Sequence, residues 1–135
     1  MVGLVPTYDH ADERVCVPLR RWPRRQIPLD LTDRLAAVAG LYEAHRNAPF
    51  PSRWRGADVA GFDMIVLDSY PSDCISVWLA QGGVLDDWRW NILAEYEQRL
   101  LRVLPELDDN GREYYQRLLD MAELVLEADC QSSSV

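Results

Sequence analysis

Apolar residues recur at helical spacing over most of the chain after residue 30. Leu31, Leu35, Val38 and Tyr42 stand three or four residues apart, which places them on one face of a helix. Asp30 precedes them as a residue type that favours the helix N-cap. The pattern therefore predicts a first helix over residues 31–46.

The C-terminal half predicts two longer helices. The first follows Asp86 as its N-cap and ends at Pro105, and its apolar stripe consists of Leu85, Trp88, Ile92, Tyr96, Leu100 and Val103. A capping box at residues 110–113 predicts a second helix that extends to about Ala128. Because the connection between them is short, the two helices are expected to pack as an antiparallel hairpin over residues 86–128.

The middle of the chain is harder to assign. Residues 57–69 favour a helix, although Met64 to Leu67 is also compatible with a buried strand, because so short an apolar run has no diagnostic period. Tyr70-Pro71 is expected to break the chain, since proline lacks a backbone donor and restricts the residue before it. Ser72 is then expected to cap a short helix that Gly82-Gly83 ends.

The first 30 residues predict an extended arm, because Pro18, Pro23 and Pro28 recur within it. The expected fold is all-α: a single-domain bundle of four or five helices over residues 31–130, with a Pro/Arg-rich arm over 1–30, a long C-terminal helical hairpin and a tail over 131–135. An alternative adds a short strand or hairpin built from residues 15–17 and 64–67.

Composition is typical of one globular domain. The chain has 135 residues, 48% of them hydrophobic, with five Trp and six Tyr, and a chain of this length forms one core. It lacks an apolar run long enough to span a membrane and has no signal-peptide pattern, so a cytoplasmic location is expected. Its three cysteines, Cys16, Cys74 and Cys130, are far apart, which suits a reducing compartment.

Charge is divided unevenly along the chain. Residues 1–55 contain nine Arg and six acidic residues, a net charge of +3, whereas residues 56–135 contain five Arg and sixteen acidic residues, a net charge of −11; together these give the formal −8. The arm carries Arg20, Arg21, Arg24 and Arg25, and we expect it to fold against the acidic body. Binding to nucleic acid is not expected, because the body repels phosphate.

Sequence motifs for catalysis or metal binding are missing. Residues 106–111 resemble the first half of a calcium loop, but Arg117 stands where that loop needs a glutamate. The chain has no Gly-rich phosphate loop, no GxSxG and no HExxH, and its only histidines are His10 and His45. His45 is assigned to the dipole at the end of the first helix. No catalytic residue, metal or cofactor is predicted.

The acidic body suggests one class of function. Aspartates recur along it, and an exposed surface made of them would attract a basic partner protein and speed its association. We therefore expect a protein-binding module, an inhibitor or adaptor of the immunity-protein or antitoxin kind. The residues assigned to this surface are Asp58, Asp63, Asp68, Asp86 and Asp87.

A second hypothesis is a small enzyme or ligand-binding protein. Trp22, Trp54, Tyr70 and Trp78 would line its pocket, and arginine forks would hold an anionic small molecule. Homodimerisation is a further expectation, since Trp90, Ala94 and Leu101 align beside the predicted core stripe of their helix. The alternative is that other helices of the same chain cover this side.

Overall fold

The computed structural model describes residues 30–133, with side chains described to residue 128. The helical prediction is confirmed in its broad form for this part of the chain, and the predicted arm, Trp22 and the strand at residues 15–17 lie outside it. The described elements are α2 (Leu31–Asn47), η2 (Ser52–Trp54), β2 (Asp58–Val59), β3 (Phe62–Asp63), α3 (Met64–Ala80), α4 (Asp87–Val103), η3 (Leu104–Glu106) and α5 (Asp109–Ser133).

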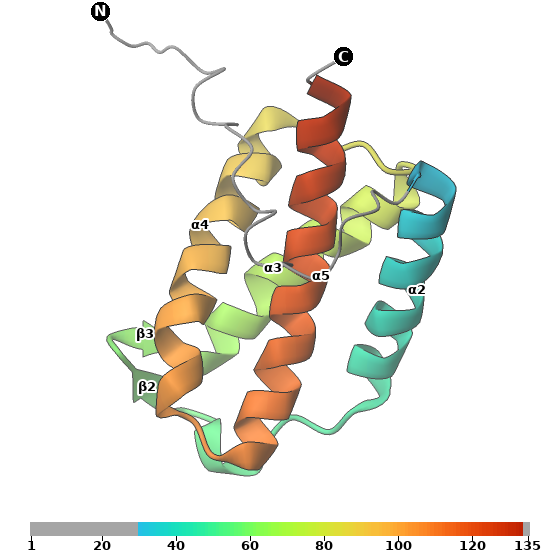
Figure 1. Cartoon of the computed structure of the whole chain (residues 1–135). Coiled ribbons are helices and arrows are strands. Elements are labelled where there is room, and N and C mark those ends of the chain that lie inside the picture. The colour runs from blue at the N-terminus through green and yellow to red at the C-terminus, as the bar shows by residue number, and fades with distance from the viewer. Residues whose placement is uncertain (1–29, 134–135) are drawn as a thin grey trace, which may run out of the picture.

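Helix α5 occupies the centre of this arrangement. It lies between α4 and α2, and α3 crosses behind it (Figure 1), so that α5 contacts all three other helices. Helices α4 and α5 are antiparallel neighbours joined by η3, which confirms the predicted hairpin. Much of the wide apolar arc of α5 packs against these neighbours, and every residue from 121 to 128 is buried.

An aspartate side chain caps the start of every described α-helix. Asp30 accepts a hydrogen bond from the Asp33 backbone N–H at 2.8 Å, and Asp86 accepts one from Arg89 at 3.2 Å; both caps were predicted. Two further caps are Asp63, which accepts from the N–H groups of Ile65 and Val66, and Asp108, which accepts from that of Gly111. The predicted capping box at 110–113 is wrong, because α5 begins at Asp109 and Asp108, two residues before Asn110, caps it.

The segment before α3 is a small hairpin. Asp58 pairs with Asp63 and Val59 with Phe62 in an antiparallel register. The turn residues Ala60 and Gly61 both have positive φ angles, 53° and 86°, which is the backbone of the two-residue turn that matches strand twist. The helix predicted over residues 57–69 is therefore wrong before Met64, and the alternative strand at 64–67 is wrong because those residues begin α3.

Helix α3 continues through Pro71, where a break was predicted. Pro71 cannot donate a backbone hydrogen bond to the preceding turn. However, the buried residues on both sides of it lie on one continuous helical face: Met64, Leu67, Cys74, Ile75 and Trp78. Burial of this face along the whole helix outweighs the local preference of proline. The short helix predicted to start at Ser72 is therefore wrong, because Ser72 lies inside α3. The predicted stop is confirmed: α3 ends at Ala80, just before Gly82 and Gly83, which have φ angles of 70° and 100°.

The predicted inner faces of α4 and α2 need correction. Trp88 of α4 is 64% exposed, whereas Trp90 and Leu93 are buried, so the helix is rotated relative to the predicted stripe. Leu31 of α2 is 47% exposed. The residues that α2 buries are Arg34, Val38 and His45. Leu35 and Tyr42, two further members of the predicted stripe, are partly buried against the core as expected. Polar side chains therefore attach α2 to the rest of the bundle alongside this apolar stripe.

Candidate functional site

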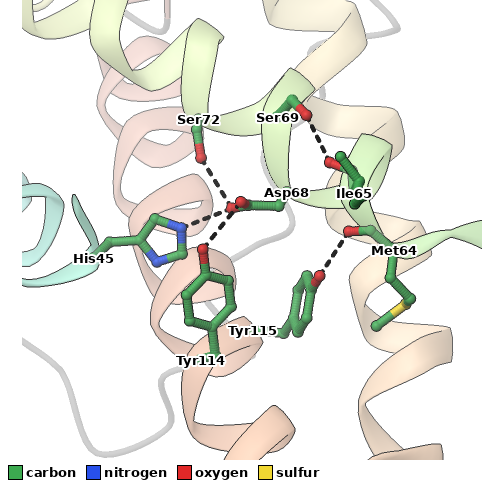
Figure 2. A network of polar contacts seen from close by, with 8 residues as sticks. All are labelled: His45, Met64, Ile65, Asp68, Ser69, Ser72, Tyr114 and Tyr115. Carbon is green, nitrogen blue, oxygen red and sulfur yellow. Dashed lines mark hydrogen bonds and ion pairs between the residues drawn. The ribbon is translucent and has the colours of Figure 1, made fainter. Parts of the chain in front are cut away.

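A polar network joins three helices at the C-terminal end of α2 (Figure 2). The His45 Nε2 atom lies 2.7 Å from Asp68 Oδ1. The Tyr114 hydroxyl donates to Asp68 Oδ2 at 3.0 Å, and the Ser72 hydroxyl donates more weakly to Oδ1 at 3.3 Å. Asp68 thus receives donors from α2, α5 and its own helix α3, which matches the requirement that a half-buried carboxylate be hydrogen-bonded.

Aromatic packing holds this network in place. The His45 and Tyr114 rings pack with centroids 4.4 Å apart, and Phe50 meets Tyr114 edge-on at 5.5 Å. The neighbouring Tyr115 hydroxyl donates to the Met64 carbonyl at 2.6 Å (Figure 2), which fixes the first turn of α3 against α5. Aromatic contacts of this kind contribute about 0.5–1.5 kcal/mol each beyond burial.

Both phenols remain protonated at neutral pH. Burial raises the pKa of Tyr114 above its ordinary value, and the adjacent Asp68 carboxylate raises it further by charge and by hydrogen bonding. Burial is also the main cause of the raised pKa of Tyr115. The two hydroxyl groups therefore act as hydrogen-bond donors and not as acids or nucleophiles near neutral pH.

An open pocket of about 380 Å³ lies against the network. We call it the His45 pocket. Its lining comes from α2, from the segment that follows it, from α3 and from α5, and consists of Tyr42, His45, Arg46, Ala48, Phe50, Arg55, Ile65, Asp68, Ser72 and Tyr114. Its volume falls within the range of about 300–1,000 Å³ that is usual for small-molecule sites.

The electrostatics of the His45 pocket oppose those of the whole chain. Among the described residues, Arg46 and Arg55 bring two guanidinium groups to its lining, and Asp68 brings one carboxylate. The Arg55 guanidinium lies over the Phe50 ring, 5.1 Å from its centroid, and Arg46 contacts the exposed Glu43 at 3.7 Å. A protein with a net charge of −8 thus presents a locally cationic pocket.

His45 is the side chain of this site that is most suited to binding or proton transfer. It is 5% exposed, and its buried Nδ1 atom has no hydrogen-bond partner among the described residues. Asp68 orients the ring through Nε2, as carboxylates do for imidazoles that exchange protons. Ser72 donates to Asp68 and not to His45, so the geometry does not activate it as a nucleophile.

The five aspartates assigned to a common acidic surface do not gather in one place. Asp63 and Asp86 are helix caps, and Asp68 belongs to the network above. Phe62, which precedes Asp63, packs under Arg99 near the end of α4, whereas Asp86 precedes the start of α4, a separation of about 20 Å along the helix. Asp58 is exposed in β2, and Asp87 is exposed as the first residue of α4.

The predicted aromatic pocket is not assembled from its described members. Trp78 is completely buried in the core. Trp54 is 8% exposed, and its Nε1 atom donates to Asp108 Oδ1 at 3.4 Å. Tyr70 lines a different groove. The aromatic and arginine residues that share the His45 pocket are Tyr42, Phe50, Tyr114, Arg46 and Arg55.

The residues assigned to a dimer surface lie on the side of α4 that faces the core. Trp90 is 4% exposed. Ala94 and Leu101 are partly buried and pack against the core cluster. Homodimerisation itself stays a prediction.

Sequence reasoning missed the His45 pair and its pocket. His45 and Asp68 are 23 residues apart, and Asp68 and Tyr114 are 46 apart, so no motif spacing connects them. One indication was available: His45 is the only histidine after residue 10, and it lies on the same face of its helix as Val38. The assignment of His45 to the helix dipole is incomplete, because its nearest charged partner is Asp68.

A comparison of the chain with protein-family models, with curated proteins and with solved structures finds no match. Among the described residues, no helix combines the length and apolarity needed to cross a membrane. The same part of the chain contains no group of three or more His, Cys, Asp or Glu residues that could hold a metal ion. The function is therefore argued from the geometry of the His45 pocket.

Proposed function

We propose that the protein binds a small anionic molecule, a carboxylate or a phosphate, in the His45 pocket. One observation carries this proposal: two arginines line the pocket, and Asp68, the one carboxylate that the described part of the chain brings to its lining, is already engaged by three donors. A carboxylate in such a state repels an incoming anion less than a free one. Arg55 is available to attract the anion, and the exposed, 3.7 Å contact of Arg46 with Glu43 is weak enough to be exchanged for it. This develops the ligand-binding hypothesis of the sequence with a different set of residues.

The arginines are suited to recognition as well as attraction. Stacking on Phe50 restrains the Arg55 fork at 5.1 Å from the ring centroid, so less conformational freedom is lost when it binds. Guanidinium forks match the geometry of carboxylate and phosphate oxygens. Tyr42, Phe50 and Tyr114 supply apolar ring surface for the remainder of the ligand. The preferred ligand therefore combines an anionic group with an aromatic or apolar part.

His45 gives the pocket a third polar contact. An unpartnered buried donor or acceptor costs about 1–3 kcal/mol, and a ligand that hydrogen-bonds to Nδ1 would recover part of this free energy. Because Nδ1 is buried in the pocket wall, this contact requires a small movement of the wall on binding. Asp68 and Tyr114 support His45 in this role by fixing its ring.

Calorimetric titration with phenyl phosphate and benzoate tests the proposal, with benzylamine as the cationic comparison. We expect the anions to bind more tightly than benzylamine. Arg55→Gln should weaken anion binding by at least about tenfold, equivalent to about 1.4 kcal/mol.

Arg53→Gln is a matched control for Arg55→Gln. Arg53 lies two residues earlier, stacks on Trp54 at 4.7 Å and contacts Asp108 at 3.1 Å, but it does not line the pocket. It should leave anion binding unchanged. Equal losses in both variants, or benzylamine binding as tight as that of phenyl phosphate, would contradict the proposal.

A further inference from the structure

A second cavity lies between α3 and α4, on a different face of α3 from the His45 pocket. We call it the Trp88 groove. It has a volume of about 480 Å³, and its lining includes Tyr70, Asp73 and Cys74 from α3 and Trp88, Arg89 and Ile92 from α4. It shares no lining residue with the His45 pocket.

Two large aromatic side chains are exposed at this groove. Trp88 is 64% exposed and Tyr70 is 52% exposed. Exposed aromatic residues that cluster beside a depression are typical of interaction sites, and Trp and Tyr contribute a large share of binding energy at protein interfaces. The exposure of Trp88 is notable because Trp90, two residues later on the same helix, is buried.

The floor of the groove is apolar. Cys74 is 4% exposed and Ile92 is partly buried against the core. Burial, together with the nearby Asp73 carboxylate, raises the pKa of the Cys74 thiol to about 11, so the thiol is neutral under physiological conditions. The groove thus offers an uncharged floor between two aromatic rings, which suits an aliphatic or aromatic side chain.

Among the described residues, the lining of the groove carries one carboxylate, Asp73, and one guanidinium, Arg89. The Arg89 Nη1 atom donates to Asp86 Oδ1 at 2.8 Å, so this guanidinium is shared with a second carboxylate beside the groove. Asp73 makes no hydrogen bond or ion pair with any residue in the described part of the chain. Arg89 also attracts Asp73 electrostatically. One guanidinium does not neutralise both Asp86 and Asp73, so the remaining carboxylate charge attracts a cation.

We propose that the Trp88 groove binds a basic, amphipathic segment of a partner protein. An apolar side chain of the partner lies between Tyr70 and Trp88, and a neighbouring Lys or Arg contacts Asp73. The net charge of −8 steers a basic segment toward the protein and increases its association rate.

Charge also disfavours the other occupants of such a groove. Nucleic acid and anionic lipid would be repelled by the carboxylate rim and by the net negative charge. A second copy of this chain would bring two proteins of charge −8 together. A basic protein segment meets neither penalty.

Three synthetic helical peptides test this inference. The first carries Leu on one face and Lys on the other, the second replaces every Lys with Glu, and the third replaces every Leu with Ser. We expect the Leu–Lys peptide to bind and to shift the NMR signals of the Trp88 indole and of Tyr70. The Leu–Glu peptide should not bind, and the Ser–Lys peptide should bind at least about tenfold more weakly.

Variants of the protein locate the binding site. Trp88→Ala and Tyr70→Ala should each weaken the Leu–Lys peptide by at least about tenfold. Leu31→Ala is the control, because Leu31 is comparably exposed at 47% but lies on α2, outside the groove. Asp73→Asn should weaken binding and reduce its salt dependence. Asp58→Asn, which changes an exposed carboxylate of β2, should do neither.

Several results would overturn the inference. These are failure of the parent protein to bind the Leu–Lys peptide, equal binding of the Leu–Glu peptide, or equal losses in Leu31→Ala and Trp88→Ala. Self-association by light scattering that Trp88→Ala abolishes would identify a second copy as the occupant instead. Circular dichroism of each variant checks that it remains folded. Anion binding at the His45 pocket is measured separately with Arg55→Gln, so either proposal can fail alone.

Discussion

The α4–α5 hairpin and helix α2 are attached to the bundle by different kinds of contact. Helix α4 buries Trp90, Leu93, Tyr96, Leu100 and Val103 along one face. Helix α2 buries one aliphatic residue, Val38, together with Arg34 and His45. Within the described chain, Arg34 donates to the Leu124 carbonyl at 3.3 Å and pairs with Glu127 at 3.4 Å.

Apolar contacts mainly stabilise the fold, whereas polar contacts mainly fix the position of one helix against another. Burial of apolar surface is non-directional, and each fully buried large side chain contributes about 1.5–3 kcal/mol. A hydrogen bond contributes about 0.5–1.5 kcal/mol net but depends strongly on geometry. The α4–α5 hairpin therefore contributes more to the folding free energy through apolar burial than α2 does, whereas the polar contacts of α2 fix the position of the His45 pocket. Four predictions test this division, from the largest expected effect to the smallest.

Removal of apolar volume from the hairpin should have the largest effect. Leu100 is completely buried, and Leu100→Ala should lower the free energy of unfolding by about 2–5 kcal/mol through lost burial and a residual cavity. Urea denaturation monitored by circular dichroism measures this change. Leu101→Ala provides a neighbouring control, because Leu101 is only partly buried and should lose clearly less. Equal losses would contradict the assigned core face of α4.

The hairpin is also the part of the fold that the sequence predicts best. Its apolar positions repeat over two long helices, and this period depends only on backbone geometry. The error at Trp88 shows the limit of that reasoning, because an amphipathic indole is stable either at a surface or in a core. Helix α4 is rotated slightly from the predicted orientation, so that Trp90 and not Trp88 is buried, while the helical period is as predicted.

The candidate site was not predictable in the same way. Asp68 occurs in a run of regularly spaced aspartates, and nothing in that spacing distinguishes it from the exposed Asp58. Its partners His45 and Tyr114 come from two other helices, so they meet only after tertiary packing. Pro71 was misread for a related reason, since the burial of α3 on both sides of the proline is a tertiary effect that local propensity does not contain.

The Asp68 network should show the next largest effect. Asp68→Ala removes the acceptor of His45 and Tyr114 together, and leaving buried donors unpaired should cost about 1–3 kcal/mol. His45→Ala and the double variant complete a cycle, in which we expect a coupling energy of about 1 kcal/mol or more. Additive effects of the two single variants would show that the pair does not hold α2 in place.

The buried thiol of Cys74, on α3, should make the stability of the protein depend on pH in the alkaline range. Because burial raises the pKa of Cys74 from its ordinary value to about 11, the unfolded chain loses this proton at lower pH than the folded protein. The contribution of the Cys74 thiol to the free energy of unfolding is constant below about pH 9 and is lost as the pH rises from 9 to 11. At pH 10 the loss attributable to Cys74 should be about 1 kcal/mol.

Cys74→Ala isolates this contribution. The variant should lose less free energy of unfolding than the parent between pH 8 and pH 10, whatever its stability at neutral pH. Urea denaturation at both pH values, performed in a reducing buffer, measures the difference. Identical pH dependence in both proteins would show that the thiol is not shielded as the structure indicates.

The smallest effects are expected on the outer face of α4, where charges contribute little to stability. Glu95 pairs with Arg99 one turn later, and an exposed pair of this type contributes about 0.3–0.5 kcal/mol. Arg99 has a second role, since its guanidinium lies 5.0 Å from the Phe62 ring centroid and 4.5 Å from that of Tyr96. Glu95→Gln should therefore change stability by less than about 0.5 kcal/mol, whereas Arg99→Ala should lose about 1 kcal/mol through cation–π and packing contacts.

Thermal unfolding at low and high salt separates the two contributions, because salt screens the ion pair more strongly than the ring contacts. If both variants lose the same amount and salt removes the loss, Arg99 acts only through Glu95 and the β2–β3 hairpin is held to α4 by other contacts.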